Sequence, residues 1–231
     1  GHSALFTAAL ERLPSAARTG WHIRRARLVE RLNGEQELRC TVTGDLKTDP
    51  FAVDGEVTID PIGANILNIA AAAAGDWTLG SPSASLQSRI RIEPGPKLET
   101  SGTVRLDDLT PSKPETDLPG VAPIALRLSY DAGFAGDAKS LSVRELNSRV
   151  LIQNREAAKL HLEKPLTISL KNNRTTESGR VRATVNRLDL APWVKLIEAL
   201  GVEMPVKLKK GTLSADVSTV VKEMGKDIAT R

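Results

Sequence analysis

The sequence predicts a mainly β fold: a curved antiparallel sheet, either an open groove or a partly closed roll, with two or three short helices. Apolar and polar residues alternate through most of the chain, which is the pattern of strands with one dry face and one wet face. Turn-forming residues separate these stretches at hairpin-like spacing. The regular alternation of strands and helices that a parallel sheet requires is absent.

The composition favours one unit built on aliphatic side chains. All-β architectures of 231 residues commonly form one domain, so residues 1–231 are interpreted as a single domain. Hydrophobic residues make up 40% of the chain but aromatic residues only 3%, so aliphatic side chains must supply the apolar surface. Few aromatic rings are available for base stacking, and no nucleic-acid partner is expected.

The N-terminal part combines a predicted helix with a hairpin. Residues 5–18 carry apolar side chains at helical spacing, which predicts a short amphipathic helix limited by Pro14. Residues 21–29 are expected to be extended. An Asn-Gly pair at 33–34 predicts a hairpin turn, after which residues 37–46 pair back.

The next stretch alternates clearly, with one interruption. Residues 51–60 read as a strand in which Gly55 marks a bend or close packing. Residues 65–74 are rich in Ala and predict a short helix lying over the sheet, with low-complexity filler as the alternative. Residues 86–92 and 98–106 are predicted strands on either side of a Pro-Gly turn.

A proline-rich segment follows, before more strands. Residues 107–123 contain too many prolines for the interior of a sheet and predict a long loop or a hinge between two halves. Strands are expected at 124–130, at 141–152 with an irregular step, and at 160–170. In the last of these, Pro165 indicates an edge or a bulge.

The C-terminal part predicts a strand, a helix and a strand. A strand at 181–190 precedes residues 191–200, which carry an apolar helical face and are followed by Gly201 as a C-terminal cap. Strand texture resumes at 206–217, and the polar tail from residue 218 is expected to fray. At the other end, residues 1–3 are interpreted as the remnant of a cleaved tag.

No motif supports catalysis. His2, His22 and His161 are isolated from other metal-type ligands, so no metal is expected, and neither a phosphate loop nor a nucleophile elbow occurs. Cys40 is the only cysteine and shares a strand face with apolar neighbours, which favours a buried small hydrophobe over a nucleophile. The chain is therefore expected to be non-enzymatic and to need no cofactor.

Charges are interleaved along the chain. The net charge of +4 arises from 32 basic and 28 acidic residues. The densest basic spots, at 24–27 and 207–210, favour solvated strand edges over phosphate contacts. Acidic pairs such as Asp107 with Asp108, or Asp54 with Glu56, would serve acid-base hydrolysis only if distant strands brought them together.

The C-terminal sequence resembles the AsmA-like family of bacterial envelope proteins, which is related to AsmA and TamB. The order is a strand ending in Leu-Asp-Leu-Ala-Pro at 188–192, a helix, and then Gly-Thr-Leu-Ser-Ala-Asp at 211–216. Residues 42–46 and 98–109 are similar to the recurring strands of this group. The resemblance in strand texture covers most of the chain.

The resemblance implies a location and a role. Members of this family have an inner-membrane helix and a long periplasmic β region, and their relatives form a β groove thought to carry lipid. A periplasmic segment of an anchored parent protein, acting in outer-membrane biogenesis with phospholipid as its partner, is thus implied. The family has no catalytic residues to carry over.

If lipid lies on this sheet, aliphatic side chains of the alternating strands should face it. The candidates are Val53, Val57, Ile59, Ile90, Ile92, Val104, Leu126, Leu128, Leu166 and Ile168. Two alternatives remain open at this point. The chain's own helices would cover the same side chains as an ordinary core, or the chain is a scaffolding module that binds another envelope protein through a sheet edge. A sugar-binding sandwich is disfavoured by the low aromatic content.

Overall fold

A computed structural model describes residues 2–12, 20–73, 75, 77–95, 97–112, 123–136, 139–170, 174–189 and 211–223, and twelve strands form one antiparallel sheet in it. The strands are β1 (His2–Arg12), β2 (Gly20–Leu32), β3 (Glu35–Thr48), β4 (Phe51–Ile62), β5 (Ser83–Glu93), β6 (Lys97–Leu109), β7 (Ile124–Ala135), β8 (Ser140–Ile152), β9 (Arg155–Lys164), β10 (Leu166–Ser169), β11 (Arg174–Asp189) and β12 (Thr212–Glu223). Helix α1 (Ala64–Ala73) connects β4 to β5.

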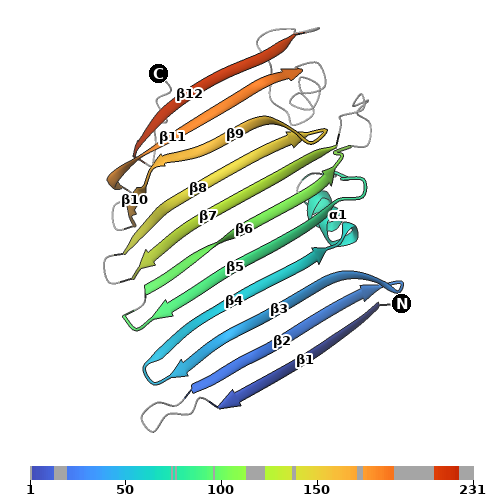
Figure 1. Ribbon diagram of the computed structural model, residues 1–231, viewed down its shortest axis with the longest axis vertical. Helices are drawn as coiled ribbons and strands as arrows, with labels where there is room; N and C mark the ends of the chain where they lie inside the picture. The colour runs from blue at the N-terminus through green and yellow to red at the C-terminus, as the bar shows by residue number, and fades with distance from the viewer. Residues whose placement is uncertain are drawn as a thin grey trace.

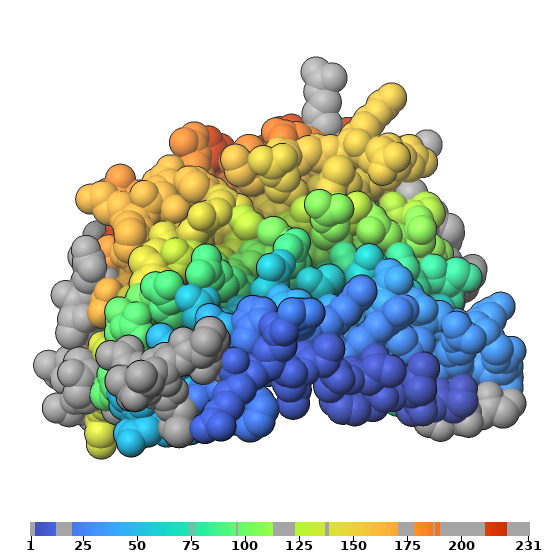
Figure 2. Space-filling model, turned by 60° about the horizontal axis from the view of Figure 1, so that its bottom comes forward, coloured from blue at the N-terminus to red at the C-terminus, as the bar shows by residue number. Residues whose placement is uncertain are grey.

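The strands follow one another across the sheet in chain order. Figure 1 shows β1 at one end and β12 at the other, with each strand beside its sequence neighbours. Figure 2 shows the same order as bands of colour that run from blue to orange and red. Neighbouring strands of a meander are joined directly, most of them by short turns, and this is why turn signals recur along the sequence.

β9 and β10 share one position in the sheet. β9 pairs with the end of β8 and β10 with its beginning, while both pair with β11. Pro165 lies between them, and proline has no N–H to donate to a neighbouring strand. The sequence predicts an edge or a bulge at Pro165, and the structure instead has a break between two strands at an interior position of the sheet.

The sheet is not closed. In the described part of the chain, β1 pairs with β2 and β12 with β11, and no pairing joins the two outer strands. The mainly β antiparallel prediction is confirmed. The prediction of two or three helices is wrong for the described residues, which contain α1 alone.

The predicted N-terminal helix is a strand in the structure. Residues 2–12 pair with β2, and Phe6 lies opposite Leu28 while Leu10 lies opposite Ile23. Apolar residues here satisfy helical spacing and also put Phe6 and Leu10 on one face of a strand, so pairing with β2 decides the outcome. Residues 13–18 of the predicted helix lie outside the described residues.

The Ala-rich helix is confirmed, but it covers little. α1 lies beside β3 and β5 at one end of the strands and has no buried residue (Figure 1). The Glu37 carboxylate accepts hydrogen bonds from the backbone N–H (3.3 Å) and the side-chain amide (2.7 Å) of Asn65 at the start of the helix. A carboxylate near a helix N-terminus is favourable. α1 is the one helix of the described residues, and with ten residues it is too short to cross a bilayer.

Two predictions about glycine and turns hold. Asn33 and Gly34 have positive φ and form the hairpin turn between β2 and β3. Gly55 marks close packing, since a Cβ there would come within 2.8 Å of the Thr43 carbonyl oxygen. Its cross-strand partner is Gly44, so two backbones approach each other at this point.

Other boundaries differ from the prediction or fall outside the described residues. Asp107 to Leu109 belong to β6, residues 113–122 of the predicted loop or hinge are not described, and the predicted helix at 191–200 is not described either. The tail does not fray at residue 218, because β12 continues to Glu223 opposite β11. His2 and Ser3, interpreted as a tag remnant, are part of β1.

The sheet has only a thin core. The buried hydrophobic side chains among the described residues are Val29, Ala84, Ala157, Leu162 and Ile168. The accessible surface of the chain is 15231 Å². A compact monomer of this length would expose roughly 10,000 Å². A sheet with no second layer among the described elements contributes to this excess, because both of its faces remain accessible.

Candidate functional site

The strand register sorts apolar and polar side chains onto opposite faces of the sheet. Residues directly opposite in antiparallel strands share a face, so a row can be followed across all strand positions. One row is apolar at every position except Ser148. This apolar row is Phe6, Leu28, Cys40, Ile59, Leu86, Val104, Leu128, Ser148, Leu160, Ala183 and Val217.

The adjacent row on the other face is polar throughout. Each of its members is the sequence neighbour of a residue in the apolar row. This polar row is Thr7, Arg27, Thr41, Thr58, Gln87, Thr103, Ser129, Asn147, His161, Arg182 and Ser218. We call the two sides of the sheet the apolar face and the polar face.

All ten lipid-facing candidates lie on the apolar face. Ile59, Val104 and Leu128 belong to the apolar row itself. Val57 lies opposite Val42, and Leu126 lies opposite Leu106. The remaining candidates occupy the same face in further pairs: Val53 with Ile92, Ile90 with Gly55, Leu166 with Val143 and Ile168 with Leu141.

The apolar face has no second layer among the described elements. Nine of the ten candidates are half-buried, and Ile168 is buried. Side chains toward the edges are more open, with Phe6 67% exposed on β1 and Val217 55% exposed on β12. A helix-covered core, the alternative raised by the sequence, would bury the central side chains, and the described helix does not do this.

A small polar cluster interrupts the centre of the apolar face. The Tyr130 hydroxyl donates to the Ser88 hydroxyl oxygen (2.9 Å), and Ser88 also lies 3.1 Å from the Thr100 hydroxyl. Tyr130 reaches Ser88 across Gly102, where a Cβ would meet the Gln87 carbonyl oxygen at 2.2 Å. The sequence alone did not predict this cluster. Its signal is a Tyr and a Gly at positions where the strand pattern expects aliphatic residues, and only the strand register shows that the two lie opposite each other.

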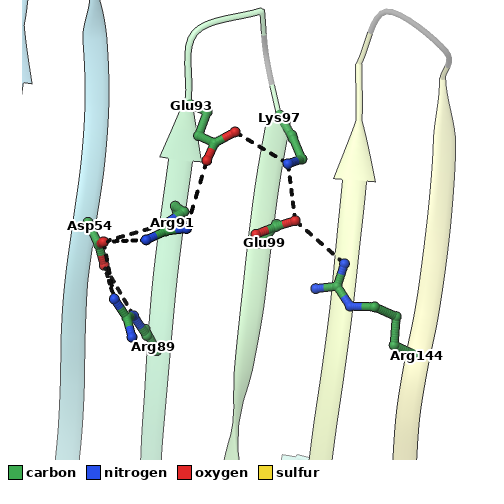
Figure 3. A network of polar contacts seen from close by, with 7 residues as sticks. All are labelled: Asp54, Arg89, Arg91, Glu93, Lys97, Glu99 and Arg144. Atoms are coloured by element: carbon green, nitrogen blue, oxygen red, sulfur yellow. Dashed lines mark hydrogen bonds and ion pairs between the residues drawn. The ribbon is translucent and has the colours of Figure 1, made fainter.

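The polar face carries a network of ion pairs across β4 to β8 (Figure 3). Asp54 accepts hydrogen bonds from Arg91 (3.0 Å) and Arg89 (3.1 Å). Lys97 lies 3.3 Å from Glu93 and 3.2 Å from Glu99. Its acidic and basic members contact one another within and across neighbouring strands, so the network compensates most of its own charge.

These contacts shift the pKa values of the groups involved. The hydrogen bond from Arg91 is the main cause that lowers the pKa of Asp54, and Arg89 adds to it, while partial burial acts in the opposite direction. Hydrogen bonds to Glu99 and Glu93 raise the pKa of Lys97. On the outer strands, the hydrogen bond from Arg182 lowers the pKa of Asp216. All these groups remain ionised near neutral pH.

The acidic pairs and the cysteine have ordinary surroundings. Asp54 and Glu56 contact basic or amide side chains on β5, and Asp107 pairs with Arg127. Cys40 is half-buried between Leu28 and Ile59 on the apolar face. Among the described residues, no group of three His, Cys, Asp or Glu side chains is placed to hold a metal ion.

His22 and His161 lie on the polar face in separate contacts. His22 Nδ1 is 2.6 Å from an Asp45 carboxylate oxygen. His161 Nδ1 contacts the side-chain oxygen of Asn147.

Comparison with known proteins adds no relative to this picture: no family model, no curated protein and no solved structure matches the chain.

Proposed function

We propose that this chain binds or conveys lipid along its apolar face, as a periplasmic segment of an AsmA-like protein that acts in outer-membrane biogenesis. The observation that carries the proposal is the apolar row, which crosses every strand position of a single-layer sheet with Ser148 as its one polar member. In this proposal the sheet curves into an open groove that has no catalytic role and needs no cofactor.

The dimensions of the apolar face suit acyl chains. Eleven strand positions, with β9 and β10 sharing one, span about 50 Å at a spacing of about 4.8 Å. Exposing a chain of roughly fifteen methylenes to water costs on the order of 12 kcal/mol. A continuous aliphatic surface offsets part of that cost without a deep pocket.

The size of this surface also argues for an occupant. Soluble monomers rarely expose contiguous apolar patches larger than a few hundred Å². The apolar face extends from Phe6 on β1 to Val217 on β12, and both residues are more than half exposed. A phospholipid is the occupant proposed here, and the resemblance of residues 188–192 and 211–216 to the AsmA-like family supports that choice, together with a periplasmic location and an inner-membrane anchor in the parent protein.

The proposal is tested by extracting the lipids that copurify with the protein and quantifying them by mass spectrometry. We expect phospholipid in the native chain, and a decrease of about tenfold or more in Val57→Asp or Leu128→Asp, because a carboxylate facing an acyl chain loses its hydration. Thr58→Asp is the matched control, since it adds the same charge to the same strand on the polar face.

Two outcomes count against lipid binding. The native chain purifies without lipid and takes none up from phospholipid vesicles, or Thr58→Asp loses as much lipid as Val57→Asp. The second outcome assigns the effect to the stability of β4 and not to its apolar face.

A second candidate is a scaffolding module that binds another envelope protein by strand addition. The observation that favours it is the pair of outer strands, each with one described neighbour and with exposed apolar side chains such as Leu10 on β1 and Val220 on β12. Unpaired strand edges are templates for another strand. Crosslinking from β1 or β12 should then capture a protein partner, while lipid extraction gives none.

A further inference from the structure

Four basic residues stand directly opposite one another on the polar face. Arg105 on β6 pairs with Arg127 on β7, Arg127 with Arg149 on β8, and Arg149 with Lys159 on β9. We call them the basic ladder. Like charges directly opposite in a sheet repel each other and lower its stability. The positions at its two ends are neutral, with Ser85 on β5 and Thr184 on β11.

Elsewhere on the polar face, like charges stand opposite in single pairs, as Asp45 with Asp54 and Asp131 with Glu145 do. In the ion-pair network, Asp54 lies opposite Arg91, and Arg91 lies opposite Glu99. Alternation of sign is therefore available to this sheet and is used on the same strands. The basic ladder is a run of four like charges, and such a break with the charge pattern of its own sheet is expected at functional sites.

The basic ladder is only half compensated. Arg127 pairs with Asp107, and Arg149 Nε lies 3.7 Å from a Glu156 carboxylate oxygen. Arg105 and Lys159 have no carboxylate partner within the described ranges of the chain. Two cations on this face are thus available to a ligand without breaking an ion pair.

The same side chains line a pocket of about 530 Å³ that opens on the polar face. The four members of the basic ladder all contribute to its lining. Ser129, Asn147 and His161 of the adjacent polar row also line the pocket. Two carboxylates line it as well: Glu156 lies beside Arg149, and Glu145 accepts hydrogen bonds from Ser129 and Asn147. Four basic side chains against two carboxylates leave the pocket with an excess of positive charge, which favours an oxyanion.

We infer that the basic ladder binds a ligand that carries two or more phosphate groups. Guanidinium groups match the oxygens of a phosphate in a bidentate manner, and successive members of the basic ladder are one strand spacing apart, about 4.8 Å. Adjacent phosphates of one ligand therefore contact adjacent strands. This site is on the opposite face from the proposed lipid surface and does not depend on it.

The inference is tested by titrating the protein with sodium tripolyphosphate in a calorimeter. We expect binding by the native chain and a loss of affinity of about tenfold or more in Arg105→Gln/Lys159→Gln, since charged hydrogen bonds to phosphate are lost. Arg89→Gln/Lys97→Gln is the matched control. It removes the same charge from the same face, and its affinity should stay within about threefold of the native value.

A second experiment, vesicle flotation, distinguishes lipid headgroups from soluble phosphates as the ligand. Flotation with phosphatidylcholine vesicles, with and without cardiolipin, shows whether lipid headgroups bind. Cardiolipin-dependent flotation that the basic-ladder variant loses assigns the site to headgroups. Tripolyphosphate binding without flotation assigns it to soluble phosphates. Absence of both in a folded native chain, or an equal loss in the control variant, overturns the inference. Circular dichroism and thermal unfolding establish that each variant is folded.

Discussion

At the scale of single residues, the apolar face depends on positions where only a small or a hydroxyl-bearing side chain fits. Gly102 lets Tyr130 lie across β6 to reach Ser88, and Ser88 is buried. A buried hydroxyl needs a hydrogen-bond partner, and Tyr130 supplies one. The polar groups at the centre of the apolar face thereby satisfy one another's hydrogen bonds.

Gly102→Ala is expected to lower the free energy of unfolding by about 1–3 kcal/mol, because the new Cβ overlaps the Gln87 carbonyl oxygen and the Ser88 backbone. Urea unfolding measures the change. Ser101→Ala, one residue earlier on the polar face, should change it by less than about 0.5 kcal/mol. Equal effects at both positions would contradict the role given to Gly102.

Asp54 predicts a pH dependence with a definite sign. Its folded pKa is lowered from the ordinary value of 3.8, chiefly by the hydrogen bond from Arg91. A lowered folded pKa stabilises the protein above the unfolded value, and this contribution is lost as pH falls through the folded value. Because the Asp54 side chain is 38% exposed, the contribution is at most about 1 kcal/mol.

Carboxyl NMR titration should therefore show Asp54 protonating below 3.8 in the native chain and closer to that value in Arg91→Gln. Arg105→Gln removes a cation from the same face without a contact to Asp54 and serves as the control. An unchanged titration of Asp54 in Arg91→Gln is the result that speaks against this assignment.

The sequence was sufficient to place the ten candidate side chains on one face, but not to show that they form rows. Alternation within a strand, as in Val57 and Thr58, is a local property. Whether Val104 lies directly opposite Leu128 depends on the register between β6 and β7. Register is set by connections and bulges, and the predicted loop at 107–123 fixes no register between its flanking strands.

At the scale of elements, strand pairing decided where local patterns were ambiguous. Residues 2–12 match both a helix and a strand, and the neighbouring β2 selects the strand. The Ala-rich stretch has no such competitor, and it forms α1 as its propensity indicates. That Pro165 disturbs the strand pattern was readable because proline acts locally, on its own hydrogen bond.

The outer strands should be the least stable elements. β1 and β12 each have one described neighbour, and their apolar side chains are exposed, as Phe6 and Val217 illustrate. Hydrogen exchange should be fastest in the amides of these two strands and slowest in β4 to β7. If β1 is protected as strongly as β5, another segment or another molecule pairs with its free edge.

At the scale of the whole molecule, the sheet carries apolar side chains on one face and charged side chains on the other, and only its backbone lies between them. One face offers aliphatic side chains across all strands, and the other carries an ion-pair network and the basic ladder. The period of two in a strand makes this separation possible without a second layer. The low aromatic content of the sequence indicated aliphatic faces, but the large open surface became evident only from the absence of a covering layer among the described elements.

The central claim is that the apolar face, and not the polar face, contacts acyl chains. Photolabelling with a fatty acid that carries a diazirine in its chain, followed by peptide mapping, tests it most directly. We expect adducts on Val104 and Leu128 and none on their neighbours Thr103 and Ser129. Equal labelling of both pairs, or no labelling of either in a folded protein, would contradict it.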